Sequence, residues 1–295
     1  MVSPPSPSLN PASKFRFLCD VPVGFAQVML QPSQMVGVAF IVGTVWNSWQ
    51  IAVFGILGCV AGTLTACLLS YPESERRNGL YGFNGALVGL GCSYFFLPSW
   101  PLLLLIVVGG AASSMIMYVM LRRDLKPFTF PFVVTTWAIF FVLAHTEWAS
   151  PIVFAPTGSQ QIVAVEALTR GVGQVLFQEA MLTGAVFAAA ILFRDWVQGV
   201  YAVMATSLGL VAGYVLGFPV DAINLGLFGY SAVLCGILFA GKTVRDFLSA
   251  LAAILLSIAI VRLFHIYDLP AFTFPFVMAS WIVLWARARI CSRVS

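Results

Sequence analysis

The segment from Asp124 to Trp137, "DLKPFTFPFVVTTW", occurs again near the end of the chain, from Asp268 to Trp281, as "DLPAFTFPFVMASW". Nine of the fourteen aligned positions are identical. Both copies open apolar stretches, and an apolar stretch can be built from many interchangeable residues. A specific repetition therefore predicts a duplicated structural unit.

Two further pairs of segments match in the same order. "GFAQVMLQPSQMVG" (Gly24 to Gly37) aligns with "GVGQVLFQEAMLTG" (Gly171 to Gly184), and "GLYGFNGALVG" (Gly79 to Gly89) aligns with "GLFGYSAVLCG" (Gly226 to Gly236). These pairs are 147 residues apart and the opening pair is 144 apart, so one loop of the second half is three residues shorter. The three pairs predict two related halves of about five spans each.

The composition is that of a membrane protein. Of 295 residues, 60% are hydrophobic and only 9% charged, too few polar side chains to cover a soluble globule of this size. No acid or base interrupts Val21 to Pro72 or Asn78 to Leu121, runs of 52 and 44 residues, and one spanning helix needs about 20. Each run therefore holds two spans. About ten spans result when the other apolar stretches are added, which lie around 128–146, 171–193, 197–217, 225–240, 244–262 and 272–286.

The distribution of basic residues predicts the orientation. With a cytoplasmic N-terminus, thirteen of the fifteen Lys and Arg residues fall on the cytoplasmic side, and only Arg170 and Arg262 fall outside. We therefore expect a multi-pass protein of the cell membrane, the inner membrane if the source is bacterial, with both termini cytoplasmic. Bases spread over many loops form no stripe for nucleic acid, so the net charge of +4 reflects topology.

An odd number of spans in each half makes the second half enter the membrane from the opposite side. Such inverted repeats pack about a pseudo-two-fold axis in the membrane plane, which brings matched segments together near the midplane. We therefore expect the repeated blocks to build the two faces of a central site. The alternative is that both copies are only helix-packing surfaces.

Each copy of the opening block pairs a threonine with a proline. Pro131 and Pro275 interrupt apolar spans and lack the N–H that a helix needs, so we expect kinks or breaks that present free carbonyls to a cavity. Thr129 and Thr273 add hydroxyls at the same depth. The alternative for these threonines is a bond to their own helix backbone.

The repeats also place amide and aromatic groups at equivalent positions. Gln27 and Gln174 match, and a buried amide must find hydrogen-bond partners, whether in a pore or between helices. Phe83 matches Tyr230, and Phe177 follows Gln174 by three. Such a set suits a small, flat, uncharged polar molecule, although any single Phe can equally be core packing.

Leu87 and Leu234 follow the matched aromatics by four residues, on the same helical face. They extend the predicted site with aliphatic walls.

Other chemistry finds little support in the sequence. Glu179 is the only acid clearly inside a span, and its first-half counterpart is Pro32, so ion coupling is not expected. His145 and His265 lie at the outer ends of spans, and no Cys/His cluster has metal spacing. Ser231 lacks a protease motif. The six cysteines read as reduced packing residues. We expect no enzymatic activity and no cofactor.

With these motifs assembled in duplicate, the chain from about Phe17 to Trp285 resembles the urea transporter family. The resemblance implies an all-α fold with two inverted five-helix repeats, each with a re-entrant half-helix, placed around Phe17 to Leu30 and Ala167 to Phe177. It also implies a homotrimer in the lipid bilayer, with a passive urea channel in each protomer. An ammonia or ammonium channel and a small-amide transporter are the alternatives.

The resemblance further implies which residues line the pore, through aromatic slots, oxygen ladders and a threonine constriction. In the two halves these are Gln27, Val28, Leu30, Phe83, Leu87 and Thr129, and Gln174, Val175, Phe177, Tyr230, Leu234 and Thr273. Leu30 departs from the aromatic at Phe177, Tyr230 adds a hydroxyl where phenylalanine is expected, and Pro32 to Gln34 replaces an Asn-Pro-type turn.

The expected organisation has five parts. In order, they are a disordered cytoplasmic N-terminal tail, the first repeat, an extracytoplasmic connecting loop, the second repeat and a cytoplasmic C-terminal tail. Their bounds are 1–16, 17–148, 149–166, 167–289 and 290–295.

Overall fold

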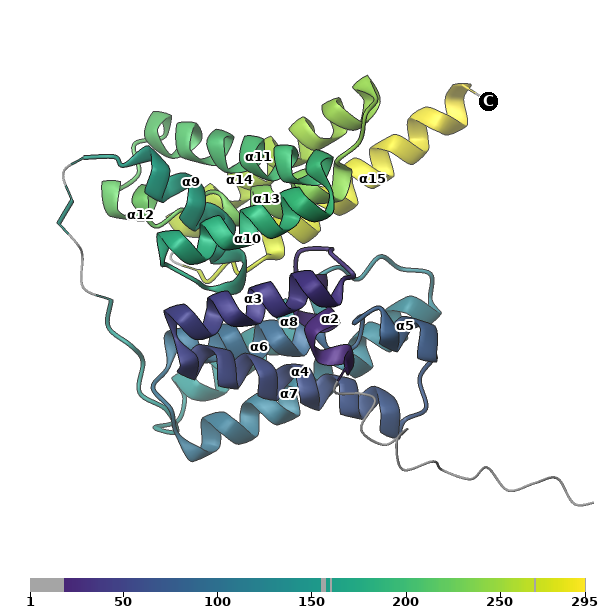
Figure 1. The fold of residues 1–295 in the computed structure, drawn as a ribbon, viewed down its shortest axis with the longest axis vertical. Helices are drawn as coiled ribbons and strands as arrows, with labels where there is room; N and C mark the ends of the chain where they lie inside the picture. Colours follow the sequence, from purple (N-terminus) through teal and green to yellow (C-terminus); the bar gives the residue numbers. More distant parts are fainter. Residues whose placement is uncertain (1–18, 155–157, 160, 268, 295) are drawn as a thin grey trace, which may run out of the picture.

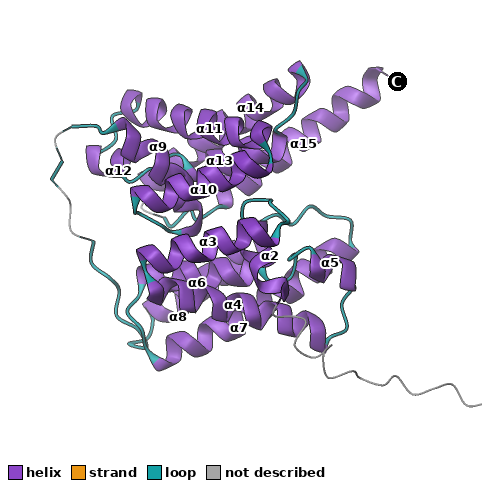
Figure 2. Cartoon of the chain, viewed as in Figure 1, coloured by secondary structure: helices purple, strands orange, loops and turns teal. Residues whose placement is uncertain are grey.

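The computed structural model describes residues 19–154, 158–159, 161–267 and 269–294, and side chains up to residue 289 apart from those gaps. The expected N-terminal tail and Asp268 lie outside these residues. The described chain is built of helices joined by loops (Figure 2). The first half contains α2 (Asp20–Gln27), α3 (Gln34–Asn47), α4 (Trp49–Leu68), α5 (Glu73–Arg77), α6 (Phe83–Phe95), α7 (Trp100–Arg122) and α8 (Phe130–Ala144). The second contains α9 (Ala164–Gly173), the 3-10 turn η2 (Gln174–Leu176), α10 (Met181–Arg194), α11 (Trp196–Val215), α12 (Val220–Asn224), α13 (Tyr230–Phe239), α14 (Val244–Ile266) and α15 (Phe274–Val294).

Four helices, α4, α7, α11 and α14, are long and apolar enough to cross a bilayer. A fifth span results if α9–η2 and α10, which meet at a bend of 76°, count together as one broken segment. The chain is therefore a multi-pass helical membrane protein, as its composition predicts. The count of ten spans stays a prediction, because α3, α8 and α13 are apolar but shorter than a bilayer requires.

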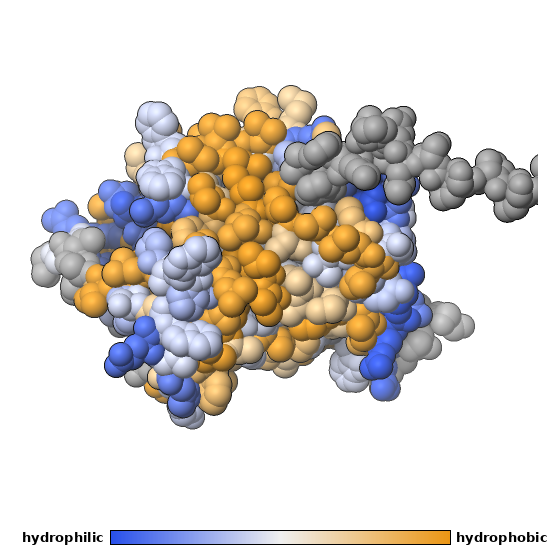
Figure 3. Space-filling model, turned by 90° about the horizontal axis from the view of Figure 1, so that it is seen from below, coloured by the Kyte–Doolittle hydropathy of each residue, from blue (hydrophilic) through white to orange (hydrophobic). Residues whose placement is uncertain are grey.

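The surface carries the pattern expected of a protein in a bilayer. Hydrophobic residues form a broad band across the face in Figure 3, with hydrophilic residues on both sides of it. Exposed tryptophans begin long helices, with Trp49, Trp100 and Trp196 each 63% or more exposed. Tryptophan is enriched where membrane meets water, so these residues suit the edges of the band.

The two halves correspond helix by helix. α3 and α4 begin and end 147 residues before α10 and α11, and α7 begins and ends 144 residues before α14. The turns match as well: Leu30 and Phe177 both have φ 58°, and Phe128 and Phe272 have φ 49° and 43°. A left-handed backbone is unfavourable for side chains of this kind, so its recurrence at matched positions marks the same local fold.

Side-chain caps explain where several of these helices begin. Ser48 and Asp195 accept backbone N–H bonds at the starts of α4 and α11, and Ser99 and Thr243 do so at α7 and α14. A short oxygen-bearing side chain at this position satisfies donors that have no partner inside the helix. Polar residues between apolar runs therefore set the helix boundaries.

The prediction that Pro131 and Pro275 kink or break their helices is wrong. α8 begins at Phe130 and α15 at Phe274, so each proline lies in the first turn of a helix. The N–H that proline lacks is unpaired at that position in any helix, so no bend follows. The break comes earlier, at Phe128 and its second-half counterpart, where the backbone is left-handed.

The halves meet face to face, with α3 beside α10 (Figure 1). Phe40 and Phe187, which occupy equivalent positions, pack with ring centroids 4.7 Å apart. Thr183 donates a hydrogen bond of 3.1 Å to the carbonyl of Gly43 across the same contact.

The repeated blocks form the second contact between the halves, and they do so reciprocally. The indole of Trp137 donates to the carbonyl of Pro270 at 2.8 Å, and the indole of Trp281 donates to the carbonyl of Lys126 at 2.7 Å. The ring contacts repeat too: Phe130 lies 5.4 Å from Trp281, and its counterpart lies 5.3 Å from Trp137. Each copy of the block is thus a binding surface for the other.

Some boundaries differ from the expected ones. α9 begins at Ala164, inside the predicted loop, and Val163 just before it donates its N–H to Oδ1 of Asn224 at 2.9 Å. α15 continues to Val294, through most of the predicted C-terminal tail. The loop after α8 is fixed to the end of α6 by an antiparallel bridge between Phe96 and Pro151.

Trp137→Phe and Trp281→Phe should each lower the free energy of unfolding by about 1 kcal/mol, because each removes one interhalf hydrogen bond and keeps an aromatic ring. Thermal unfolding of the protein in detergent measures this, with the exposed Trp100→Phe as the control. Unequal effects, with one tryptophan neutral, would show that the contact is not reciprocal.

Candidate functional site

Thr129 and Thr273 meet where the two halves face each other. The hydroxyl of Thr273 donates to the hydroxyl oxygen of Thr129 at 2.6 Å, and each side chain is 2% exposed. Each threonine immediately precedes its helix, α8 or α15, so its hydroxyl is free of that helix. The sequence predicted two threonines at equal depth, and the structure brings them into direct contact.

Phenylalanine rings and carbonyls surround the threonine pair in matched positions. Phe128 packs on Phe276 at 5.4 Å, and Phe272 packs on Phe132 at 5.5 Å. The carbonyl of Phe272 accepts a 2.8 Å bond from the Tyr230 hydroxyl.

The equivalent carbonyl, that of Phe128, accepts a 3.4 Å bond from the side-chain amide of Asn84. A carbonyl oxygen has two lone pairs, so each of these oxygens can take one more donor.

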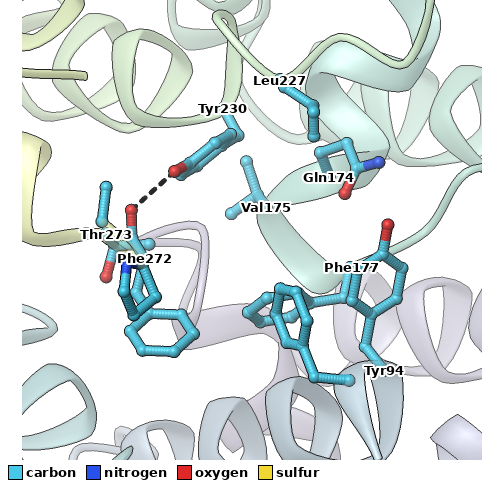
Figure 4. Close-up of a pocket in the computed structure, with 11 residues that line it drawn as sticks. Tyr94, Gln174, Val175, Phe177, Leu227, Tyr230, Phe272 and Thr273 are labelled. Carbon is cyan, nitrogen blue, oxygen red and sulfur yellow. Dashed lines mark hydrogen bonds between the residues drawn. The ribbon is translucent and has the colours of Figure 1, made fainter. Parts of the chain in front are cut away.

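A cavity of about 120 Å³ lies beside Thr273, and most of its lining comes from the second half (Figure 4). Its wall is largely aromatic and aliphatic, with a few polar groups among the rings. Small-solute sites commonly have this composition, because a few placed polar groups then fix the orientation of the ligand. The lining consists of Tyr94, Phe95, Gln174, Val175, Phe177, Leu227, Tyr230, Pro270, Ala271, Phe272 and Thr273.

Five of the twelve predicted pore residues line this cavity: Gln174, Val175, Phe177, Tyr230 and Thr273. The others do not. Val28, Phe83, Leu87 and Leu234 are buried in the core, Leu30 packs against it, Gln27 ends α2 and Thr129 meets Thr273. All five predicted residues that line the cavity belong to the second half, and a pore role for Leu234 and the first-half residues stays a prediction.

The matched glutamines each keep an unpartnered polar atom. Gln27 Oε1 and Gln174 Nε2 are buried and have no hydrogen-bond partner in the described part of the chain. A buried amide atom without a partner costs about 1–3 kcal/mol. Gln174 is also on the cavity wall, so its N–H can meet a ligand acceptor there.

Sequence reasoning missed several residues. Tyr94 and Phe95 line the cavity from α6, and no repeat marks Tyr94, whose counterpart is Gly241. Gln31 and Gln178 are buried at 2% and 0%, and each amide bonds the carbonyl two residues before it. Gln31 and Gln178 occupy matched positions in the repeated block, and that match could have signalled a shared role. In the structure both stabilise the turn that ends the preceding helical segment.

Neither histidine lines the cavity. His145 caps the end of α8 and approaches the carbonyl of Phe141 with Nδ1 at 2.8 Å, and His265 lies in the last turn of α14 beside Phe218. Glu179 follows the η2 turn and accepts a hydrogen bond from the Tyr94 hydroxyl. Within the described residues, no three His, Cys, Asp or Glu side chains are grouped for a metal ion.

Fold and site together define a polytopic helical membrane protein with a small, mostly apolar site between two related halves. The family model for the urea transporter matches residues 21–288, so the chain belongs to the urea transporter family. It is 30% identical to Urea transporter 1 of Mus musculus over 287 residues, covering 88% of this chain and 74% of the relative. Urea transporter 1 of Rattus norvegicus is 30% identical and that of Ovis aries 28%, with the same coverage. The resemblance drawn from the repeated motifs is confirmed, and the chain is a transporter rather than an enzyme.

The threonine contact can be tested by a double-mutant cycle. Thr129→Val or Thr273→Val alone should lower the free energy of unfolding by about 1–3 kcal/mol, since each leaves one buried hydroxyl unpaired, whereas the double variant should recover part of that loss. Thermal unfolding in detergent provides the four values. Strictly additive losses would mean that the two hydroxyls do not interact.

Proposed function

We propose that this protein is a passive channel for urea, with the route running between its two halves. Membership of the urea transporter family and the relatives named Urea transporter 1 support urea as the solute. The observation that carries the route is the buried contact between Thr129 and Thr273, with a cavity beginning at Thr273. The polar groups near this contact lie between aromatic rings, and they suggest how urea could pass.

The mechanism rests on hydrogen-bond exchange. Urea has N–H donors and one carbonyl acceptor, and removing their water without replacement would raise a barrier of several kcal/mol. The threonine hydroxyls and the free lone pairs of the Phe128 and Phe272 carbonyls can accept its N–H groups, and Gln174 Nε2 can donate to its carbonyl. Urea then passes in either direction, without coupling to the movement of an ion. Hydrated ions are excluded, because the aromatic wall returns too little of their hydration energy.

The twelve pore residues keep their proposed roles in this scheme. Gln27, Gln174 and the threonines exchange hydrogen bonds with urea, while the aromatic and aliphatic members form flat walls. Leu30 in place of an aromatic makes the first-half slot less aromatic than the one at Phe177. Tyr230 adds a hydroxyl, which donates its hydrogen bond to the carbonyl of Phe272.

The proposed architecture has ten spans in two inverted five-helix repeats, joined by a loop outside the cell, with both termini cytoplasmic. The constant offsets between helices support the repeats. The 76° bend between α9–η2 and α10 supports a re-entrant segment, with α2 as its counterpart. The excess of basic residues on one side supports the orientation in the cell membrane. In the lipid bilayer, three such protomers form a homotrimer in this proposal, each with its own pore and without a cofactor.

Stopped-flow light scattering of proteoliposomes tests the solute. We expect fast urea influx that is insensitive to pH and sodium and exceeds the fluxes of acetamide, glycerol and methylammonium under equal gradients. Influx of methylammonium without urea would favour an ammonia channel, and urea flux driven by an imposed proton gradient would refute passive transport.

Thr129→Val and Thr273→Val should each slow urea influx about ten-fold, because a barrier rises by about 1.4 kcal/mol when one hydrogen bond to the solute is lost at the narrowest point. The same proteoliposome measurement detects this, with Thr65→Val as control, because that hydroxyl lies near the C-terminal end of α4 and bonds the carbonyl of Ala61 in its own helix. If both variants fold and conduct as the parent does, the threonine pair is not on the route.

A further inference from the structure

Tyr94 lines the cavity, and behind it the phenol pairs with the carboxylate of Glu179, which joins the two halves. Tyr94 comes from α6 in the first half, and Glu179 follows η2 in the second. The Tyr94 hydroxyl donates to Oε1 of Glu179, and the ring of Tyr94 lies 5.6 Å from that of Phe177. Phe154 also stacks on the Tyr94 ring, with centroids 5.0 Å apart.

These contacts fix both the ring and the hydroxyl proton of Tyr94. The proton is committed to Glu179, so the lone pairs of the oxygen remain as acceptors. In Figure 4 the hydroxyl points toward the side chain of Gln174, whose buried Nε2 has no partner within hydrogen-bond distance but is a neighbouring donor for the phenol oxygen. An acceptor and a donor thus lie close together on one wall.

Tyr230 repeats the arrangement on the other wall of the same cavity. Its hydroxyl proton is committed to the carbonyl of Phe272 at 2.8 Å, which again leaves the phenol oxygen as an acceptor (Figure 4). The cavity therefore offers two phenol oxygens as acceptors and one amide N–H as a donor. A planar molecule with a carbonyl between two amino groups satisfies all three, whereas a methyl group in place of one amino group leaves a phenol oxygen unpaired.

We propose that Tyr94 is a specificity-determining residue that makes this cavity select diamides over monoamides, and that Glu179 is its positioning residue. The inference rests on the proposed function and names residues beyond it. Neither group has a symmetric equivalent: the counterparts of Tyr94 and Glu179 are Gly241 and Pro32. The selection therefore belongs to one side of the threonine pair. A site built to bond a donor rejects an analogue that lacks it, because the acceptor would be left buried and unpaired.

The experiment compares urea with acetamide in proteoliposomes and reports the ratio of their permeabilities. Tyr94→Phe should lower this ratio about five-fold, the value of roughly one hydrogen bond, by slowing urea and not acetamide. Tyr201→Phe is the matched control, because it removes a hydroxyl that bonds the carbonyl of Gly241 at 2.9 Å and does not line the cavity. Its ratio should equal that of the parent.

Variants of Glu179 separate positioning from simple folding effects. Glu179→Gln keeps an oxygen that accepts the Tyr94 proton, so its ratio should stay within about two-fold of the parent. Glu179→Leu removes the acceptor and should lower the ratio as Tyr94→Phe does. The double variant Tyr94→Phe with Glu179→Leu should be no lower than Tyr94→Phe alone.

Each outcome is informative. If the parent carries no urea, the proposed function fails and the inference falls with it. If the parent carries urea but Tyr94→Phe slows urea and acetamide equally, the function stands and the inference is overturned, because the tyrosine is then structural. The inference is also overturned if Glu179→Leu lowers the ratio equally in the parent and in the Tyr94→Phe background, since the two residues would then act independently.

Discussion

The structure depends on the reciprocal contact between the two copies of one block. Each copy supplies an indole donor to the other copy's loop and a phenylalanine to the other copy's tryptophan, and the two threonines join at the centre. The threonine bond is buried, where an unmade hydrogen bond is expensive, and the two indole bonds lie at the exposed edges of the contact. Any change to one copy therefore acts on both halves, and this explains why nine of fourteen residues are identical in segments where many apolar residues would serve.

Away from this contact the halves differ, most clearly at the outer ends of corresponding helices. In the first half Tyr71 stacks on Tyr118 at 3.9 Å, whereas the equivalent positions of the second half hold Phe218 with Arg262 over its ring at 4.4 Å. The ion pair of Asp20 and Arg76 in the first half is replaced by an apolar cluster. Under the proposed inverted arrangement these ends would face different compartments, while the centre is shared by both halves.

The sequence was most informative where the two halves touch. Composition was enough to predict the membrane setting, and the matched blocks were enough to predict the duplication, the family and the central position of Thr129 and Thr273. The error at Pro131 arose because the residue types in an apolar run do not mark where a helix begins. α8 begins at Phe130, after the left-handed backbone at Phe128, and no residue type predicts that turn. Tyr94 was missed because its partner, Glu179, is 85 residues away in sequence and unmatched by symmetry. Such a pair is visible only once α6 and η2 are placed in space.

The reciprocal contact also constrains the order of events during biosynthesis. The first block emerges from the ribosome 144 residues before the second. Through that interval Trp137 has no carbonyl of Pro270 to bond, and the hydroxyl of Thr129 has no Thr273. The first half must therefore wait in the membrane with its central face open, protected by lipid, by the insertion machinery or by early helices of the second half. α15 completes the core described here, so a chain that stops short of Phe274 lacks the partner surface of its own first half.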